Sequence, residues 1–229
     1  QSFETTYEMF QGKDPRFLAS IYVPGSSLLG STMQFQRGLI LKDGSKYYAQ
    51  SAPGPSYLLE TYIDPETQRK DTIFGKDGGT YTGDASKTGF NIRKFVNENL
   101  KTEAQWDFGK TETSFPIFRL AEVYLNLAEA AVEMGKYQTE AFEAIKKIRD
   151  RAGVVTPFAV VDVEKVRHER QVELAFEGHR FWDMKRWRIA HLPVDQGGLN
   201  GFRGAGLHPF FDLRIRKYVF EVANDLPKR

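Results

Sequence analysis

The sequence predicts a mainly α-helical fold with a loop-rich first half that contains short strands. Three observations support this prediction. Apolar residues recur at spacings of three and four between residues 116 and 153, charges recur at helical spacing between 162 and 187, and Gly, Pro, Ser, Thr and Asp clusters interrupt the chain before residue 114. We therefore divide the chain into a loop-rich part (1–113), a helical hairpin (114–153), and a charged helix with a C-terminal segment (154–229).

Composition limits the class of protein. The chain has 229 residues, of which 41% are hydrophobic and 27% charged, as in ordinary globular proteins. With 32 basic and 30 acidic residues, no general affinity for nucleic acid is expected. Cysteine is absent, which excludes disulfides and thiolate chemistry. No apolar run approaches the roughly 18–20 residues of a transmembrane segment.

In the loop-rich part, short apolar segments lie between turn-forming clusters. Residues 19–23, 46–49 and 91–96 are the expected strands. Most segments between turn signals are shorter than about ten residues, so long helices are not expected there.

The first helix of the hairpin is predicted to begin at Pro116 and to end at Gly135. Its expected buried stripe consists of Ile117, Leu120, Ala121, Tyr124, Leu127, Ala128, Ala131 and Val132.

The second helix is predicted to be capped by Thr139 and to end at Gly153. Phe142, Ile145 and Ile148 share one face of it. The short connection makes the two helices antiparallel, and Ala128 and Ala131 allow a close approach, as in tetratricopeptide-like hairpins. One such unit cannot bury both of its faces, since repeat stacks generally need about three units.

The third helix is expected to begin after Asp162 and to run from Val163 to Glu177 or beyond. Charged side chains three residues apart on it lie within pairing reach, and large aromatic residues alternate with them. We therefore predict a semi-buried structural charge network, with Arg170–Glu173, Glu177–Arg180 and Asp183–Arg186 as its pairs.

These same residues carry a family resemblance. The pattern ER-x-x-EL-x-x-EG-x-R-x-x-D-x-x-RW is filled from Glu169 to Trp187, and four further landmarks are DPR (14–16), GFNIRKF (89–95), RLAEVYLNLAEA (119–130) and IRDRAG (148–153). The chain resembles the C-terminal portion of the SusD/RagB family, the outer-membrane nutrient-binding lipoproteins of Bacteroidetes-type bacteria.

The resemblance implies a function without catalysis. It implies binding of an oligosaccharide or polysaccharide at the extracellular face of the outer membrane, as in polysaccharide utilisation, and delivery to a SusC-like TonB-dependent transporter, with no cofactor. Family members are longer, so we expect this chain to be a piece whose lipid anchor lies in an absent N-terminal part. The ending also lacks the family's Pro-Ile-Pro element, so the C-terminus is either trimmed or diverged.

Aromatic residues in the loop-rich part are candidate ligand contacts. Flat rings beside polar groups suit the apolar faces of sugars. The candidates are Tyr57, Tyr62, Tyr81 and Trp106. The alternative is that each ring covers core beneath a loop, and the resemblance places most family glycan contacts upstream of this chain.

The sequence gives weaker support for catalysis or metal binding. Glu173 and Glu177 would suit acid–base work on a sugar, but a neighbouring arginine keeps a carboxylate ionised and a poor acid. His168 and His179 lie too far apart along a helix to share a metal, so no metal site is expected. Two alternatives stay open: a tetratricopeptide-type protein-interaction module without a small ligand, and a glycan-processing enzyme.

Overall fold

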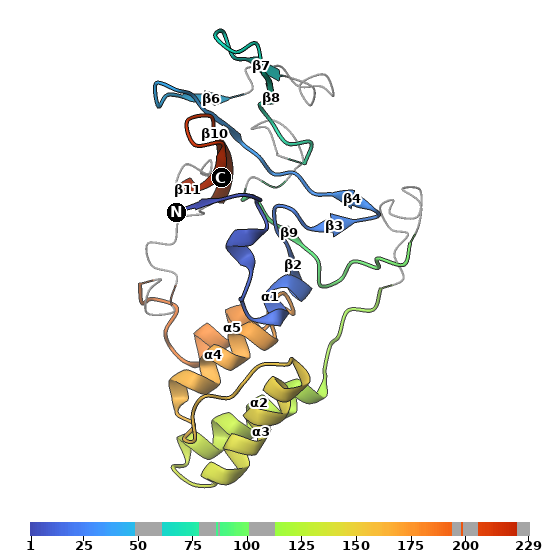
Figure 1. The fold of residues 1–229 in the computed structure, drawn as a ribbon. Helices are drawn as coiled ribbons and strands as arrows, with labels where there is room; N and C mark the ends of the chain where they lie inside the picture. Colours follow the sequence, from blue (N-terminus) through green and yellow to red (C-terminus); the bar gives the residue numbers. More distant parts are fainter. Residues whose placement is uncertain are drawn as a thin grey trace.

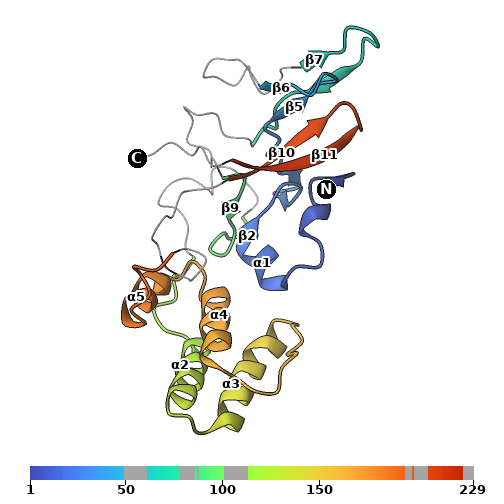
Figure 2. The ribbon, with the colours of Figure 1, turned by 90° about the vertical axis from the view of Figure 1, so that its left-hand side faces the viewer.

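A computed structural model describes residues 1–48, 61–77, 86, 88–100, 113–193, 198 and 206–223. Strands gather at one end of the molecule and the longer helices at the other (Figure 1). The view in Figure 2 shows the same two lobes, with α1 (Pro15–Ser20) between them. A short 3₁₀ helix, Glu8–Phe10, precedes α1.

The largest sheet has five strands in the order β1-β11-β10-β5-β6. They are β1 (Ser2–Phe3), β5 (Gly38–Ile40), β6 (Lys46–Tyr48), β10 (Gly206–Asp212) and β11 (Lys217–Ala223). β10 pairs in parallel with β5, whereas the other pairings are antiparallel. The long hairpin β10–β11 was not predicted, so the expected mainly helical fold is only partly correct.

Three further strand pairs lie in the first half of the chain. They are β2 (Ile21–Tyr22) with β9 (Asn91–Ile92), β3 (Ser27–Leu28) with β4 (Ser31–Thr32), and β7 (Thr61–Ile63) with β8 (Lys70–Thr72). The strand expected at 46–49 is confirmed as β6, and those at 91–96 and 19–23 are confirmed only at 91–92 and 21–22. Residues up to Ser20 form α1 instead, because Asp14 caps the backbone N–H of Arg16 and Pro15 occupies the first helical position.

The hairpin consists of α2 (Leu120–Glu133) and α3 (Gln138–Arg151). The prediction that Pro116 begins the first helix is wrong, because the chain bends at residues 117–118 and the N-cap residue Arg119 has an extended backbone. The buried face is accordingly shifted: Leu125 is fully buried, whereas Ile117 is 90% exposed. Leu120 and Leu127 are also exposed, while Ala121, Ala128 and Ala131 are buried as predicted.

α3 follows a tight turn. Gly135 and Gly153 have positive φ at the two helix ends, as predicted. The cap predicted at Thr139 is wrong, since Tyr137 is the N-cap residue and has a left-handed backbone. Both helices pack with α4 around one core, to which α3 contributes Ala141, Ala144, Ile145 and Ile148.

The charged segment forms two helices, α4 (Val163–Glu173) and α5 (His179–Arg186). Asp162 caps α4 as predicted, by accepting a hydrogen bond from the backbone N–H of Lys165. The prediction that this helix continues to Glu177 is wrong, because Phe176 and Gly178 both have positive φ and turn the chain. Among the described residues, none of these helices has the length and apolar content needed to cross a membrane.

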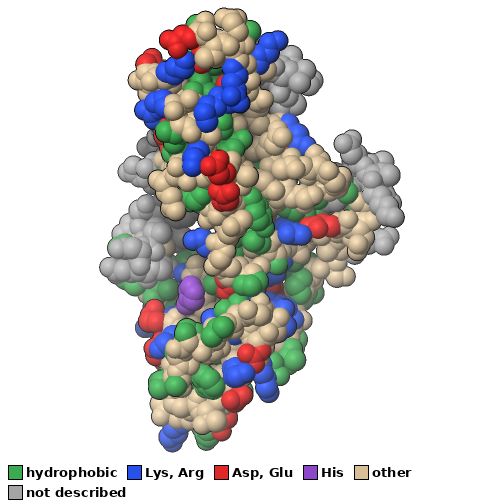
Figure 3. All heavy atoms as spheres, in the orientation of Figure 1, with side chains coloured by type: hydrophobic (Ala, Val, Ile, Leu, Met, Phe, Trp, Pro, Cys, Tyr) green, Lys and Arg blue, Asp and Glu red, His purple; other side chains and the backbone are tan. Residues whose placement is uncertain are grey.

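The surface carries both signs of charge. Basic and acidic side chains lie side by side over the face seen in Figure 3, including the tip of the sheet lobe. This mixture agrees with the net charge of +2.

Candidate functional site

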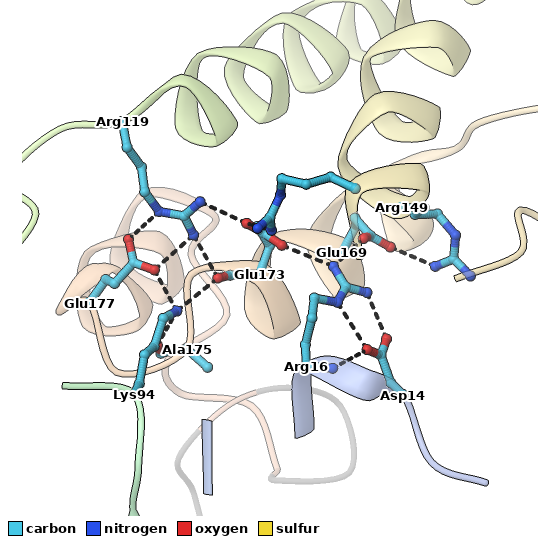
Figure 4. Close-up of polar contacts among 10 residues, drawn as sticks. Asp14, Arg16, Lys94, Arg119, Arg149, Glu169, Glu173, Ala175 and Glu177 are labelled. Atoms are coloured by element: carbon cyan, nitrogen blue, oxygen red, sulfur yellow. Dashed lines mark hydrogen bonds and ion pairs between the residues drawn. The ribbon is translucent and has the colours of Figure 1, made fainter. Parts of the chain in front are cut away.

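Three buried carboxylates lie at the centre of the molecule, where the helices meet α1 and the segment after β9 (Figure 4). Glu169 and Glu173 project from α4, and Glu177 lies in the turn that follows it. Their exposures are 2%, 3% and 5%. Charges this well buried are stable only when each is paired.

Glu169 and Glu173 receive arginines from three other elements. Arg16 of α1 lies 2.5 Å from Glu169 and 3.2 Å from Glu173. Arg149 of α3 lies 2.7 Å from the second oxygen of Glu169. Arg119 and Arg151 lie 2.7 and 2.6 Å from the same oxygen of Glu173.

Glu177 is bound from two sides. Arg119 donates to both of its oxygens at 2.7 Å, and Lys94 lies 2.5 Å away. Burial raises the pKa of Glu177, but the hydrogen bonds from Arg119 and Lys94 outweigh that effect and leave its pKa below the ordinary value. Glu177 is therefore ionised at neutral pH.

The same cations also satisfy the backbone where α4 ends. Lys94 donates to the carbonyls of Glu173 and Ala175 at 3.1 and 2.9 Å, and Arg119 donates to that of Glu173 at 2.8 Å. Carbonyls at a helix C-terminus lack partners within the helix, so these bonds complete the end of α4.

Arg16 is held in place by Asp14, which accepts from Nε and Nη2 at 3.0 and 2.7 Å. Burial lowers the pKa of Arg16, yet its bonds to Asp14 and Glu169 raise it overall. The DPR sequence thus makes a helix cap and an ion-pair donor from adjacent residues.

A second cluster links α4 to α5 and α2. Arg170 donates to Asp183 and to Asn126, both at 2.8 Å, and Asp183 lies 2.9 Å from Arg186. Arg186 also binds Glu129, which accepts from the indole N–H of Trp187 at 2.6 Å.

The predicted network residues are thus brought together, but with other partners than the sequence indicated. The pair Asp183–Arg186 is present as expected. Arg170 pairs with Asp183 in place of Glu173, and Glu177 binds cations from outside α4 and α5. The Arg180 guanidinium lies 5.8 Å from the ring of Trp187. Because the chain turns at Phe176 and Gly178, helical spacing does not describe residues 174–180.

The cationic partners of the three glutamates were not predicted as site residues. Yet each lies in a landmark motif: Arg16 in DPR, Lys94 in GFNIRKF, Arg119 in RLAEVYLNLAEA, and Arg149 and Arg151 in IRDRAG. The sequence therefore contained a signal for these ion pairs. Each of the other landmark motifs contains an arginine or a lysine, and residues 169–177 supply the three glutamates.

A hollow of about 380 Å³ opens beside the network. Arg151, Lys94 and Arg119 line it together with Glu173 and Glu177. Both carboxylates already accept bonds from these bases, and the pKa of Glu177 is lowered by its bonds to Arg119 and Lys94, whereas a general acid needs a raised pKa.

Of the four predicted ligand contacts, Tyr57, Tyr81 and Trp106 lie outside the described residues. Tyr62 lies on β7 and is half-buried. Its ring packs beside Tyr47, 5.7 Å between centroids, over a core cluster of Leu39, Ile73 and Leu213.

The fold and the network define a protein in which a helical hairpin is joined to a β-sheet lobe through buried ion pairs. The model of the SusD family matches residues 1–209, and the chain belongs to that family.

Two curated relatives come from Formosa agariphila. The SusD-like protein P2 is 31% identical over 101 residues, which cover 39% of this chain and 20% of that protein. The SusD-like protein P25 is 39% identical over 80 residues, covering 32% and 15%. These matches thus span a fifth or less of the relatives' length.

A solved structure, a SusD-like carbohydrate-binding protein from Bacteroides fragilis, is similar in fold. Its TM-score is 0.54 at 28% sequence identity, and the match covers 81% of this chain and 31% of the other.

Proposed function

We propose that the protein binds an oligosaccharide or polysaccharide without catalysis, at the extracellular face of the outer membrane, and delivers it to a SusC-like TonB-dependent transporter. The ligand is captured and released, with no bond made or broken. The observation that carries this proposal is the SusD-family match over residues 1–209, together with the similarity to a SusD-like carbohydrate-binding protein.

The network supports a non-catalytic role. Glu173 and Glu177 are the carboxylates best placed for sugar chemistry, yet both are tied to bases from several elements. A pair that cleaves glycosides needs one carboxyl group with a raised pKa, and the pKa of Glu177 is lowered. The network is suited to holding the helical lobe and the sheet lobe in a fixed position relative to each other.

The α2–α3 hairpin supports a protein partner for the helical lobe. Ala128 and Ala131 are buried in the core that α2 shares with α3, and this close packing supports a tetratricopeptide-like unit. On its outer side, apolar residues spaced by three, four and seven remain exposed: Leu120, Val123, Leu127 and Met134. These exposed apolar residues also favour the alternative function, a tetratricopeptide-type interaction module without a small ligand.

The ligand would be held by the loop aromatics Tyr57, Tyr62, Tyr81 and Trp106. The lipid anchor would lie in a preceding part of the protein. The test is calorimetric titration of this chain, and of a form extended at its N-terminus, with a panel of polysaccharides. Binding supports the proposal. If neither form binds any glycan while peptides bind, the interaction module replaces it.

A further inference from the structure

A second hollow, of about 610 Å³, lies in the sheet lobe, away from the glutamate network. Five segments line it: the stretch after β1, Gly25 between β2 and β3, the stretch from β4 to β5, the end of β8 with Gly75, and β11. A cavity of this volume falls within the range of small-molecule sites, about 300–1,000 Å³. We call it the β-lobe hollow.

The floor of the β-lobe hollow is held by backbone hydrogen bonds. Gly75 donates to the carbonyl of Gln36 and Asp77 to that of Gln34, both at 3.0 Å. Gly25 donates to the carbonyl of Met33 at 2.9 Å. The hollow is therefore formed by fixed backbone, and a ligand would enter a site already ordered.

Gln36 presents an amide oxygen that no described residue bonds. Its side chain is 9% exposed, and its amide N–H₂ group donates to the carbonyls of Thr72 and Ile73 at 2.7 and 3.2 Å. Those two acceptors fix the orientation of the amide, so the Oε1 atom is the free one. This oxygen is open to solvent, so a ligand hydroxyl can donate to it in place of a water molecule.

Tyr218 presents a second such group. Its ring lies on β11 against Phe211, with centroids 5.1 Å apart. Burial raises the pKa of its hydroxyl, and no described residue bonds that hydroxyl. Tyr7 and Thr72 also line the hollow, and no side chain in the described part of the chain bonds their hydroxyls.

The lining is almost free of formal charge. Among its described residues Glu4 alone is ionic, and Lys217 lies 2.8 Å from it. Met33 and Phe35 supply buried apolar surface. An ionic ligand would find no counter-charge, whereas a neutral ligand rich in hydroxyl groups matches hydroxyls, an amide oxygen and flat rings.

We propose that the β-lobe hollow binds an uncharged saccharide unit, at a position separate from the loop aromatics. This inference rests on the proposed glycan-binding function for its class of ligand. It adds a location and a preference for neutral over acidic sugars.

The test uses calorimetric titration of the whole chain with neutral and uronic-acid oligosaccharides of equal length. Tyr218→Phe and Thr72→Val each remove one hydroxyl at nearly constant shape. We expect each to weaken binding of the neutral ligand about fivefold, because one net hydrogen bond is lost. Thr61→Val is the matched control, since Thr61 lies opposite Thr72 in the β7–β8 pair but outside the hollow.

The outcomes separate the two proposals. Weakening by both hollow variants, with Thr61→Val unchanged and unchanged thermal denaturation throughout, supports the site. Unaltered neutral-sugar binding in both hollow variants overturns the proposal that the hollow binds a sugar, but it leaves the proposed function standing. Loss of neutral-sugar binding in Tyr62→Phe alone leads to the same conclusion. Equal or tighter binding of uronic acids overturns the preference. Absence of any saccharide binding overturns both.

Discussion

Glu173 holds one buried carboxylate among three guanidinium groups, and this arrangement makes its charge structural. We predict that Glu173→Gln lowers the free energy of unfolding by about 2–4 kcal/mol, because Arg16 and Arg119 lose a buried counter-charge. Urea unfolding followed by circular dichroism measures this. Glu133→Gln, on the exposed side of α2, is the control and should have almost no effect. Unchanged stability with lost sugar turnover would instead indicate an enzyme.

The network also predicts how stability depends on pH. Burial raises the pKa of Glu177, but its bonds to Arg119 and Lys94 outweigh this and lower its pKa in the folded state below the ordinary 4.5. The folded state then binds fewer protons than the unfolded state, so the stabilisation is present above about pH 4.5 and is lost as the pH falls through the folded pKa. We expect the melting temperature to decline below that pH.

Glu177→Gln provides the comparison for this pH dependence. The variant should start with a lower melting temperature at pH 7 and lose less of it on acidification. Parallel curves for the two proteins would mean that other carboxylates, such as Asp14 or Glu129, whose pKa values are also lowered, carry the acid sensitivity.

Among the elements, the turn between α4 and α5 sets the position of Glu177. Gly178 has φ of +81°, and a Cβ built there would meet no atom within 4 Å. Gly178→Ala should therefore cost about 1–2 kcal/mol through backbone conformation alone. Gly178→Asn should cost less, because Asn tolerates the left-handed region. Equal losses for both variants in thermal denaturation would contradict this explanation.

Much of the helical lobe follows from local rules. Gly135, Gly153 and Asp162 act at helix ends as the sequence indicated, because each effect depends on a few adjacent residues. The helix start at Pro116 was mispredicted because local propensity could not show that Arg119 reaches Glu173 and Glu177 from an extended backbone, whereas the cap predicted at Thr139 failed because Tyr137 takes a left-handed backbone that its residue type does not indicate. Long-range contacts decided the first of these positions.

The sheet and the ion-pair partners were less predictable. β10 is buried along most of its length, so it lacks the polar alternation that identifies a half-exposed strand. Its partner β5 lies far away in sequence, and a parallel pairing of that kind carries no local signal. Glu173 and Glu177 were found by their spacing, whereas Glu169 was not placed in the predicted network although it pairs with Arg16 and Arg149, because spacing within a helix cannot identify partners on other elements.

For the whole molecule, the contacts predict cooperative unfolding. Arg16 and Lys94 tie the first part of the chain to α4, and β1 and β5 pair with the C-terminal strands. In a Trp106→Phe variant the remaining Trp182 and Trp187 report on the helical lobe, and far-UV circular dichroism reports on all elements. The two signals should share one urea midpoint. An earlier tryptophan transition would show that the helical lobe unfolds independently.

The pairing of Ser2 with Val219 also governs events during synthesis. A nascent chain makes the α2–α3 hairpin from neighbouring residues as they leave the ribosome. The edges of β1 and β5 must wait for β11 and β10, which are translated after every other described element. Until then these strands have unsatisfied backbone groups that other chains can pair with, so chaperones are needed most before β10 and β11 have left the ribosome.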